Sequence, residues 1–385
     1  MRGAAARPAH APSPRDRALV RSLDRIVDAP GFQQGFWGVY VYSLDRKRVL
    51  YNHNGDRWFT PASNAKLFTL AAALHLLGPE FRLHTTLQAS VPPDDAGVIA
   101  GDLSLVGVGD PSFSGRTYPY VNDPATPQLP FDPGKVPRVL AQQLVARGVK
   151  RITGDIVGDD SYFDFDPYPD GWAIGDEMWD YGAPVSALTL NDNTRFLQIF
   201  PGAAPGAAPR LVWAPAADPP KLRDLAATTA AGGRTRLRLR EDAATGELVL
   251  EGGIAADSPG ELQALAVRHP ARYAAELLRQ ALLDAGVVVE GQARARHAPA
   301  PGAGYVLWQW DSPPLAESLQ VTAKISQNLE AELMLRLLGK LRGAGASGGS
   351  EAAAGEAVVG IAPDGDRPDG FLSFLSHHPE AVWLS

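Results

Sequence analysis

The 385-residue sequence contains no cysteine. This absence excludes disulfides, thiolate metal sites and cysteine catalysis, and it leaves the redox compartment undetermined. No apolar stretch approaches the length that a helix needs to cross a bilayer, so we expect no transmembrane span. The first twenty residues are rich in Ala, Pro and Arg without a continuous apolar core, so no signal peptide is visible in this sequence.

Basic residues are fewer than acidic ones, and the formal net charge is -7. Because phosphate binding needs a basic surface, this charge argues against a nucleic-acid partner. A hydrophobic fraction of 45% and a charged fraction of 21% are typical of a folded globular protein. At this length the chain has room for two or more domains and a large core.

Apolar spacing and turn residues predict the main elements. Residues 1 to about 15 are expected to form a disordered leader, and 19–26 an amphipathic helix. The β-rich runs 38–42 and 48–51 predict a hairpin. The apolar spacing of 67–77 predicts a helix that Gly78-Pro79 ends. Further strands are predicted at 81–89, 103–106, 152–157, 236–240 and 247–250, further helices at 136–146, 271–285, 315–321 and 329–339, and irregular surface chain at 203–220.

A serine and a lysine lie three residues apart at the start of the 67–77 helix, in the run TPASNAK of residues 60–66. On a helix, residues i and i+3 share a face, so Lys66 is in reach of the Ser63 hydroxyl and can accept its proton. The helix start favours developing negative charge, and the Ser63 N–H can contribute to an oxyanion hole. Taken alone, the pair also fits an N-cap serine followed by a solvated lysine.

A second polar cluster, Lys324-Ile325-Ser326-Gln327-Asn328, directly precedes a Leu-rich helix. On a tight loop the Ser326 hydroxyl and the Asn328 amide point the same way, so that the hydroxyl relays a proton and the amide holds a substrate carbonyl. The structural alternative is that Ser326 is an N-cap and Asn328 a polar surface residue of the first turn.

These two motifs, in this order and separated by a long insertion, resemble the low-molecular-mass penicillin-binding proteins of the D-alanyl-D-alanine carboxypeptidase/endopeptidase family (peptidase family S13). Roughly nine-tenths of the chain takes part in the resemblance. Similar segments lie at 38–74, 101–103, 108–111, 152–157, 161–163, 181–188, 191–193, 312–315 and 326–329, with Glu332.

The resemblance implies a serine β-lactamase/transpeptidase-like α+β domain, an antiparallel sheet with helices, that carries a large β-rich insertion. Its first part is expected at 16–87, the inserted domain or domains at 88–304, and its incomplete second part at 305–385. The implied catalytic residues are Ser63, Lys66 and Ser326, with Asn328 binding substrate. No cofactor or metal is implied.

The resemblance further implies a serine-type carboxypeptidase that acts on peptidoglycan stem peptides ending in D-Ala-D-Ala. Ser63 would form an acyl-enzyme, and β-lactams would acylate the same serine as covalent inhibitors. The implied location is periplasmic or extracytoplasmic. A serine β-lactamase fits less well because the insertion between the motifs is too long.

The third motif of this family is missing from the sequence, which has neither K-T-G nor K-S-G, and its D-G-S-G segment is also missing. Residues 371–385 resemble the helix just upstream of that motif, so we expect that the chain stops before it. Because losing one oxyanion donor costs about a hundred- to a thousandfold in rate, we expect weak or no activity from these 385 residues. The alternative function is an inactive relative that only binds peptidoglycan or a partner.

Other candidate residues are better explained by structure. We interpret Asp159, Asp160, Asp164 and Asp166 as solvated turn carboxylates, because no spaced set of metal ligands follows them. His377-His378 is expected to be a surface pair, and the G-x-S-x-G match at 345–349 a chance match in a flexible loop. A substrate cleft and core packing are both open as roles for Trp172, Trp179 and Tyr181.

Overall fold

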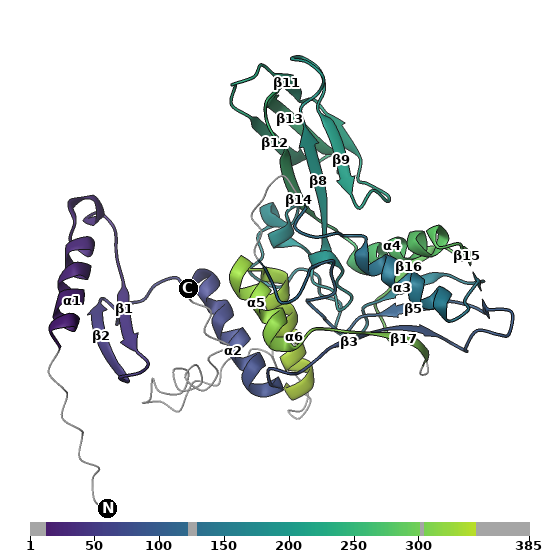
Figure 1. Ribbon diagram of the computed structural model, residues 1–385, viewed down its shortest axis with the longest axis horizontal. Helices are drawn as coiled ribbons and strands as arrows, with labels where there is room; N and C mark the ends of the chain where they lie inside the picture. Colours follow the sequence, from purple (N-terminus) through teal and green to yellow (C-terminus); the bar gives the residue numbers. More distant parts are fainter. Residues whose placement is uncertain (1–12, 122–128, 301–303, 344–385) are drawn as a thin grey trace, which may run out of the picture. The chain divides into compact units, whose positions relative to one another are not determined.

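The computed structural model describes residues 13–121, 129–300 and 304–343, which form a mixture of helices and small sheets (Figure 1). The described chain divides into two compact units between Ala65 and Lys66. This division falls inside the segment 16–87 that was assigned to one domain, and the domain boundaries at 87/88 and 304/305 stay a prediction.

The first unit consists of a helix and a hairpin, as predicted for 19–26, 38–42 and 48–51. Its elements are α1 (Pro14–Val27), η1 (Pro30–Phe32), β1 (Val39–Ser43), β2 (Arg48–His53) and η2 (Ala62–Asn64). Ser13 and Asp16 form a capping box that starts α1. Residues 14 and 15 therefore belong to the helix and not to the leader, of which 1–12 lie outside the described residues. Asp16 also binds Arg46 at 2.6 Å and Arg48 at 2.5 Å, which ties the helix to the hairpin.

The second unit carries the other α-helices of the described residues, and the apolar spacing predicted all of them. They are α2 (Ala65–Leu77), α3 (Lys135–Ala146), α4 (Pro270–Asp284), α5 (Leu315–Ile325) and α6 (Asn328–Gly343). Gly78, with φ of 89°, follows α2 as expected of a helix-ending glycine. The prediction that the last helix ends at Gly339 is wrong, because α6 continues through this glycine to Gly343.

Five strands from distant parts of the chain form the largest sheet, in the order β16-β7-β5-β3-β17. The two strands β3 (His84–Ala89) and β17 (Tyr305–Asp311) run antiparallel, with Tyr305 opposite Ala89. They bring together the chain before and after the intervening segment (Figure 1). The other three strands are β5 (Leu103–Val106), β7 (Ile156–Asp159) and β16 (Ala293–Arg296), which run parallel to one another. Helices α3 and α4 supply much of the buried core beside this sheet, including Leu140, Leu144, Ala274 and Leu278.

Three smaller sheets complete the unit. Their strands are β4 (Val98–Ile99), β6 (Arg151–Ile152) and β15 (Val288–Val289); β8 (Thr194–Phe200), β9 (Arg210–Ala214) and β14 (Glu261–Ala266); and β10 (Leu222–Asp224), β11 (Ala227–Thr229), β12 (Arg236–Glu241) and β13 (Leu248–Ala255). The single strand predicted at 152–157 is wrong, because β6 and β7 belong to different sheets. The irregular chain predicted at 203–220 is also wrong in part, because β9 pairs with β8 inside it.

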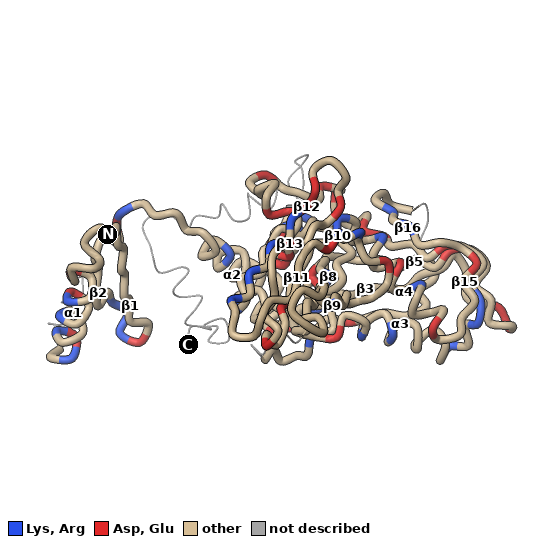
Figure 2. Tube along the Cα trace, turned by 90° about the horizontal axis from the view of Figure 1, so that it is seen from above, with Lys and Arg blue, Asp and Glu red and all other residues tan. Residues whose placement is uncertain are grey.

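Basic and acidic residues both lie around β10, β12 and β13, as Figure 2 shows. Arg240 binds Glu251 at 2.9 Å across β12 and β13, and Arg223 binds Asp242 at 3.3 Å. The charges of Arg223 and Arg240 are therefore locally neutralised. Among the described residues, no helix combines the length and the apolar character that crossing a membrane requires.

Candidate active site

Ser63 lies in the single turn η2, which continues directly into α2. The turn is held by Asn64 N, which donates to Pro61 O at 3.0 Å, and by the Ala65 N–H, which points to the carbonyls of Ala62 and Ser63. Ala62 has φ of 45°, a left-handed conformation that is uncommon for a residue with a side chain. Ser63 is exposed and belongs to the first unit, three residues before Lys66 in the chain.

Lys66 lies in the first turn of α2 and is half-buried. Its Nζ donates a hydrogen bond to the Ser326 Oγ at 3.2 Å, although the two residues are far apart in the sequence. Burial lowers the pKa of Lys66 from its ordinary value of 10.5, because desolvation disfavours the ammonium form. A lysine in this state is neutral more often and is a better proton acceptor.

Ser326 and Asn328 lie at the tight connection between α5 and α6. Ser326 is the left-handed residue that ends α5, with φ of 59° and ψ of 39°. Asn328 is the first residue of α6, and its Nδ2 donates to the Tyr181 carbonyl at 2.7 Å. The N-cap interpretation of Ser326 does not describe this geometry, because its hydroxyl contacts Lys66 and its backbone terminates a helix.

The structure thus brings Lys66 and Ser326 into contact and places Asn328 two residues further on. Near this contact, sequence reasoning considered Tyr181 only for its aromatic ring and did not single out Glu330. The Tyr181 carbonyl holds Asn328, and Glu330 is buried in the first turn of α6 with only 1% of its surface exposed. The signal for Glu330 was an acidic residue within a Leu-rich helix. A carbonyl partner such as that of Tyr181 leaves no signal in side-chain patterns.

Only some of the four aspartates that were interpreted as solvated turn carboxylates are exposed to solvent. Asp159 and Asp160 are buried, and they bind Arg296 at 3.2 Å and His297 at 2.8 Å. The solvated interpretation is therefore wrong for this pair. Within the described ranges, no three His, Asp or Glu side chains are grouped as metal ligands. The predictions for 345–349 and 377–378 lie outside the described residues.

The three aromatic residues at 172–181 have different environments. Trp179 packs against the buried cluster that includes Leu197 and Leu265, so core packing describes it. Tyr181 is 47% exposed, and its carbonyl binds Asn328. Trp172 is half-buried.

A cavity of about 430 Å³ opens among α4, β8, β9 and β14, with Arg195, Trp213, Leu265 and Tyr273 in its lining. None of Lys66, Ser326 and Asn328 lines it. The cavity is therefore separate from the contact between the two motifs.

Comparison with known proteins shows the family to which the chain belongs. The profile of the D-Ala-D-Ala carboxypeptidase 3 (S13) family matches residues 19–361. This match covers well over half of the sequence, and the chain belongs to this family.

Three curated relatives of the chain come from three different organisms. The chain is 30% identical over 354 residues to the D-alanyl-D-alanine carboxypeptidase of Actinomadura sp. (strain R39), covering 90% of this chain and 62% of the relative. It is 23% identical over 303 residues to the D-alanyl-D-alanine carboxypeptidase DacB of Haemophilus influenzae, covering 78% of this chain and 58% of DacB. The penicillin-sensitive carboxypeptidase A of Dictyostelium discoideum is 23% identical over 327 residues, with 80% and 59% covered. The chain therefore spans roughly six-tenths of the length of these relatives.

Among solved structures, penicillin binding protein 4 (dacB) from Haemophilus influenzae is similar, with a TM-score of 0.64 at 22% identity over 84% of this chain and 66% of that one. The same protein complexed with a novel β-lactam gives a TM-score of 0.56 at 22% identity, over 78% and 60% of the two chains. These similarities confirm the predicted α+β, transpeptidase-like fold.

Proposed function

We propose that this chain carries two catalytic motifs of a serine D,D-peptidase that hydrolyses the D-Ala-D-Ala terminus or the crosslinks of peptidoglycan peptides. Ser63 is the nucleophile and Lys66 its base. Ser326 relays a proton, and Asn328 holds a carbonyl of the substrate. The family, and the carboxypeptidase activity in the names of its relatives, support this substrate class.

The reaction follows from these roles. The Ser63 Oγ attacks the carbonyl carbon of the penultimate D-alanine and passes its proton to the neutral Lys66 amine. The C–N bond then breaks, and the leaving amine takes a proton from the Lys66 ammonium through the Ser326 hydroxyl. Water hydrolyses the Ser63 ester and frees the enzyme. A β-lactam acylates the same oxygen by opening its ring.

The observation that carries this proposal is the hydrogen bond from the Lys66 Nζ to the Ser326 Oγ at 3.2 Å. It joins the S-x-x-K and S-x-N motifs, which lie in distant parts of the sequence, at one point. The lowered pKa of Lys66 supports a role as base. The penicillin-sensitive relative from Dictyostelium discoideum and the Haemophilus influenzae structure complexed with a β-lactam support inhibition by this class of compound. The substrate implies a periplasmic or otherwise extracytoplasmic location.

The test is covalent labelling of the purified chain with a labelled penicillin, followed by mapping of the modified peptide. Because the sequence lacks K-T-G, we expect slow labelling over hours, about a hundred- to a thousandfold below a complete site for one lost donor. The label is expected on Ser63 and is absent from Ser63→Ala. Ser90→Ala, which changes another exposed serine, is the matched control and labels like the unmodified chain.

Two outcomes would count against the proposal. Labelling that persists in Ser63→Ala would show that the nucleophile is another residue. A folded chain that binds stem peptide but is never labelled would support the alternative, an inactive relative that only binds peptidoglycan.

A further inference from the structure

On the buried side of the Ser326–Asn328 turn, one residue from each flanking helix takes part in a hydrogen-bonded link between the two helices. Thr322, in the last turns of α5, accepts a hydrogen bond on its carbonyl from Gln327 N at 3.2 Å. Its hydroxyl donates to the Glu330 Oε2 at 2.7 Å. Thr322 is fully buried, and Glu330 is 1% exposed. Both sides of the turn are therefore fastened to the same threonine.

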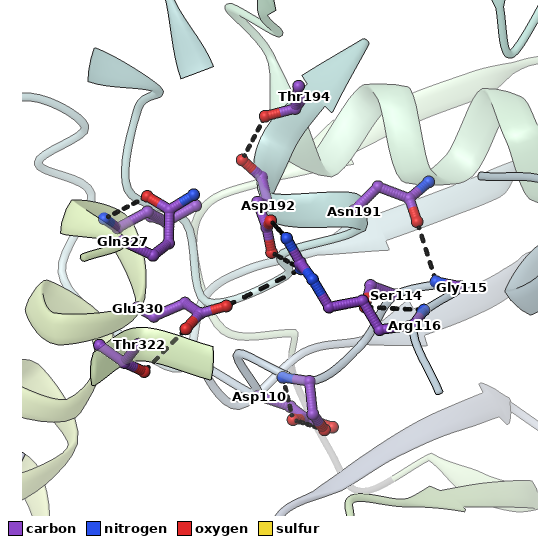
Figure 3. A network of polar contacts seen from close by, with 12 residues as sticks. Asp110, Ser114, Gly115, Arg116, Asn191, Asp192, Thr194, Thr322, Gln327 and Glu330 are labelled. Carbon is purple, nitrogen blue, oxygen red and sulfur yellow. Dashed lines mark hydrogen bonds and ion pairs between the residues drawn. The ribbon is translucent and has the colours of Figure 1, made fainter. Parts of the chain in front are cut away.

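Glu330 in turn faces an arginine from the segment between the two motifs, as Figure 3 shows. The Arg116 Nη1 lies 3.9 Å from the Glu330 Oε1, which has no hydrogen-bond partner among the described residues. Arg116 binds Asp192 with both terminal nitrogens, one of them at 2.7 Å. Its guanidinium also lies over the Phe131 ring, 4.7 Å from the centroid. The arginine is thus fixed by contacts on two sides.

Asp192 is held toward Arg116 by an unusual backbone. The three consecutive residues Asn191, Asp192 and Asn193 have φ of 55°, 55° and 51°, a left-handed conformation that Asn and Asp adopt more readily than other residues with a side chain, but normally one residue at a time. Two buried amides hold this turn: Asn191 Nδ2 donates to Pro133 O, and Asn193 Nδ2 to Pro184 O, each at 2.8 Å. Strain that the surroundings enforce in this way is common where a side chain must be aimed.

Stability alone is a poor explanation for this group. Two buried carboxyl groups, those of Asp192 and Glu330, lie beside the single guanidinium of Arg116, and the buried carboxyl of Asp110 is close enough to raise the pKa of Glu330. Desolvating such charges costs about as much as their attraction returns, so buried ion pairs seldom add net stability. A better-supported use of buried ion pairs is to fix one arrangement of neighbouring elements. The elements that meet here are the strained turn at 191–193, the loop that carries Arg116, and the start of α6.

We propose that Thr322, Glu330 and the Arg116–Asp192 ion pair are positioning residues that hold the Ser326–Asn328 turn in its reactive arrangement. This inference rests on the proposed function, because it assigns the turn to the peptidase site. None of the four touches the substrate. They act by limiting the positions that Ser326 can take against Lys66. The segment between the motifs thereby contributes to catalysis from a distance.

The test compares Thr322→Val and Arg116→Met with the unmodified chain by two measurements. Hydrogen exchange at the backbone amides of Gln327 and Leu329 reports the turn directly. The rate of Ser63 labelling by a labelled penicillin reports its consequence. In both variants we expect exchange at these two amides to rise about tenfold or more, and labelling to slow by about tenfold to a hundredfold, as for other small misplacements of a catalytic group.

Arg116→Lys keeps the charge but loses the two-pronged contact with Asp192, so it is expected to fall between Arg116→Met and the unmodified chain. Arg138→Met is the matched control, because Arg138 is an exposed arginine of the same unit that binds Asp132. It is expected to leave both measurements unchanged. Thr322→Val replaces one hydroxyl by a methyl, and its two measurements decide the outcome if the Arg116→Met variant does not fold.

The inference is wrong if both the hydrogen exchange and the labelling rate stay unchanged in the variants. It is also wrong if hydrogen exchange rises uniformly through α4 and the sheets while the folded protein is labelled at the original rate. The second result would describe a residue that only stabilises the fold. If the unmodified chain is never labelled, the proposed function fails, whereas exchange at Gln327 and Leu329 still decides whether these residues position the turn.

Discussion

Lys66 combines the features that a general base needs, since it is half-buried, lies one turn after a serine in the chain and contacts Ser326. Burial lowers its pKa and raises the fraction of neutral amine at a given pH. Arginine in the same position would keep the contact but would not give up its proton. Comparing lysine with arginine at position 66 therefore distinguishes a need for positive charge from a need for a proton acceptor.

We predict that the rate of Ser63 labelling by a labelled penicillin rises with pH, because only the neutral form of Lys66 accepts the Ser63 proton. The midpoint of this rise is expected below 10.5, the ordinary value for lysine. Lys66→Arg should lower the rate by about a hundredfold or more, as expected for loss of a general base. Lys324→Arg, at an exposed lysine close to Ser326, should leave the profile unchanged. A profile that is flat with pH in the unmodified chain would contradict the role of Lys66.

At the scale of single residues, the sequence was enough to indicate the candidate site residues that belong to short motifs. Ser63 and Lys66 are three residues apart, and helical spacing alone predicts that they share a face. The contact between Lys66 and Ser326 joins two such motifs, and only the resemblance to a family suggested it. The partners of Glu330 could not be predicted, because Arg116 and Asp192 come from separate loops and no local pattern relates them.

At the scale of elements, the packing of α4 on the largest sheet depends on one glycine in β7. A Cβ added at Gly158 would lie 1.8 Å from the carbonyl oxygen of Ala271 in the first turn of α4. No atom in that contact can move independently, because the oxygen belongs to the helix backbone. The helix approaches this strand closely because the strand has no side chain at this position.

Gly158→Ala is therefore expected to push α4 away from β7 and to lower the free energy of unfolding by about 1–3 kcal/mol, as other overpacked cores do. Chemical denaturation followed by circular dichroism measures this change. Gly175→Ala is the matched control, because a Cβ there meets no atom within 4 Å. Equal stability of the two variants would show that α4 does not depend on this close approach.

Helices were easier to predict than strands for a physical reason. The apolar spacing of α2, α3 and α4 is local, and their observed bounds differ from the predicted ones by one or two residues. Strand β9 was missed because its Ala- and Pro-rich surroundings resemble a surface loop, and only its pairing with β8 orders it. The run at 152–157 divides into β6 and β7 around Gly154, whose N–H donates to the Gly101 carbonyl at 2.9 Å, a contact that the sequence does not show.

At the scale of the whole second unit, a group of buried polar residues lies where α5 and α6 face the loops that carry Asp110, Arg116 and Asp192 (Figure 3). These loops lie between β3 and β17, whose pairing closes the intervening segment. Changes of protonation in this region should therefore alter the stability of the unit as a whole, because the segment and the helices share these contacts.

Asp110 provides the clearest example. It is 1% exposed, and its Oδ1 accepts hydrogen bonds from the Ser112 N at 2.8 Å and the Ser112 Oγ at 2.6 Å. Its Oδ2 has no partner among the described residues. Burial raises the pKa of Asp110 from 3.8 to about 6, since desolvation outweighs the hydrogen bonds from Ser112. The folded state therefore binds the proton more tightly than the unfolded state does.

A raised pKa of a carboxyl group stabilises the folded state at low pH. The contribution is fully present below 3.8 and is lost as the pH rises through about 6. We therefore predict that Asp110 lowers the free energy of unfolding by about 2–3 kcal/mol between pH 4 and pH 8, from roughly 1.4 kcal/mol per pKa unit. Asp110→Asn keeps an oxygen acceptor for Ser112 but does not ionise, so its thermal midpoint should fall less over this range. Asp170→Asn, at an exposed aspartate of the same unit, should follow the unmodified chain. Parallel curves for all three proteins would show that Asp110 is not the group whose ionisation destabilises the unit.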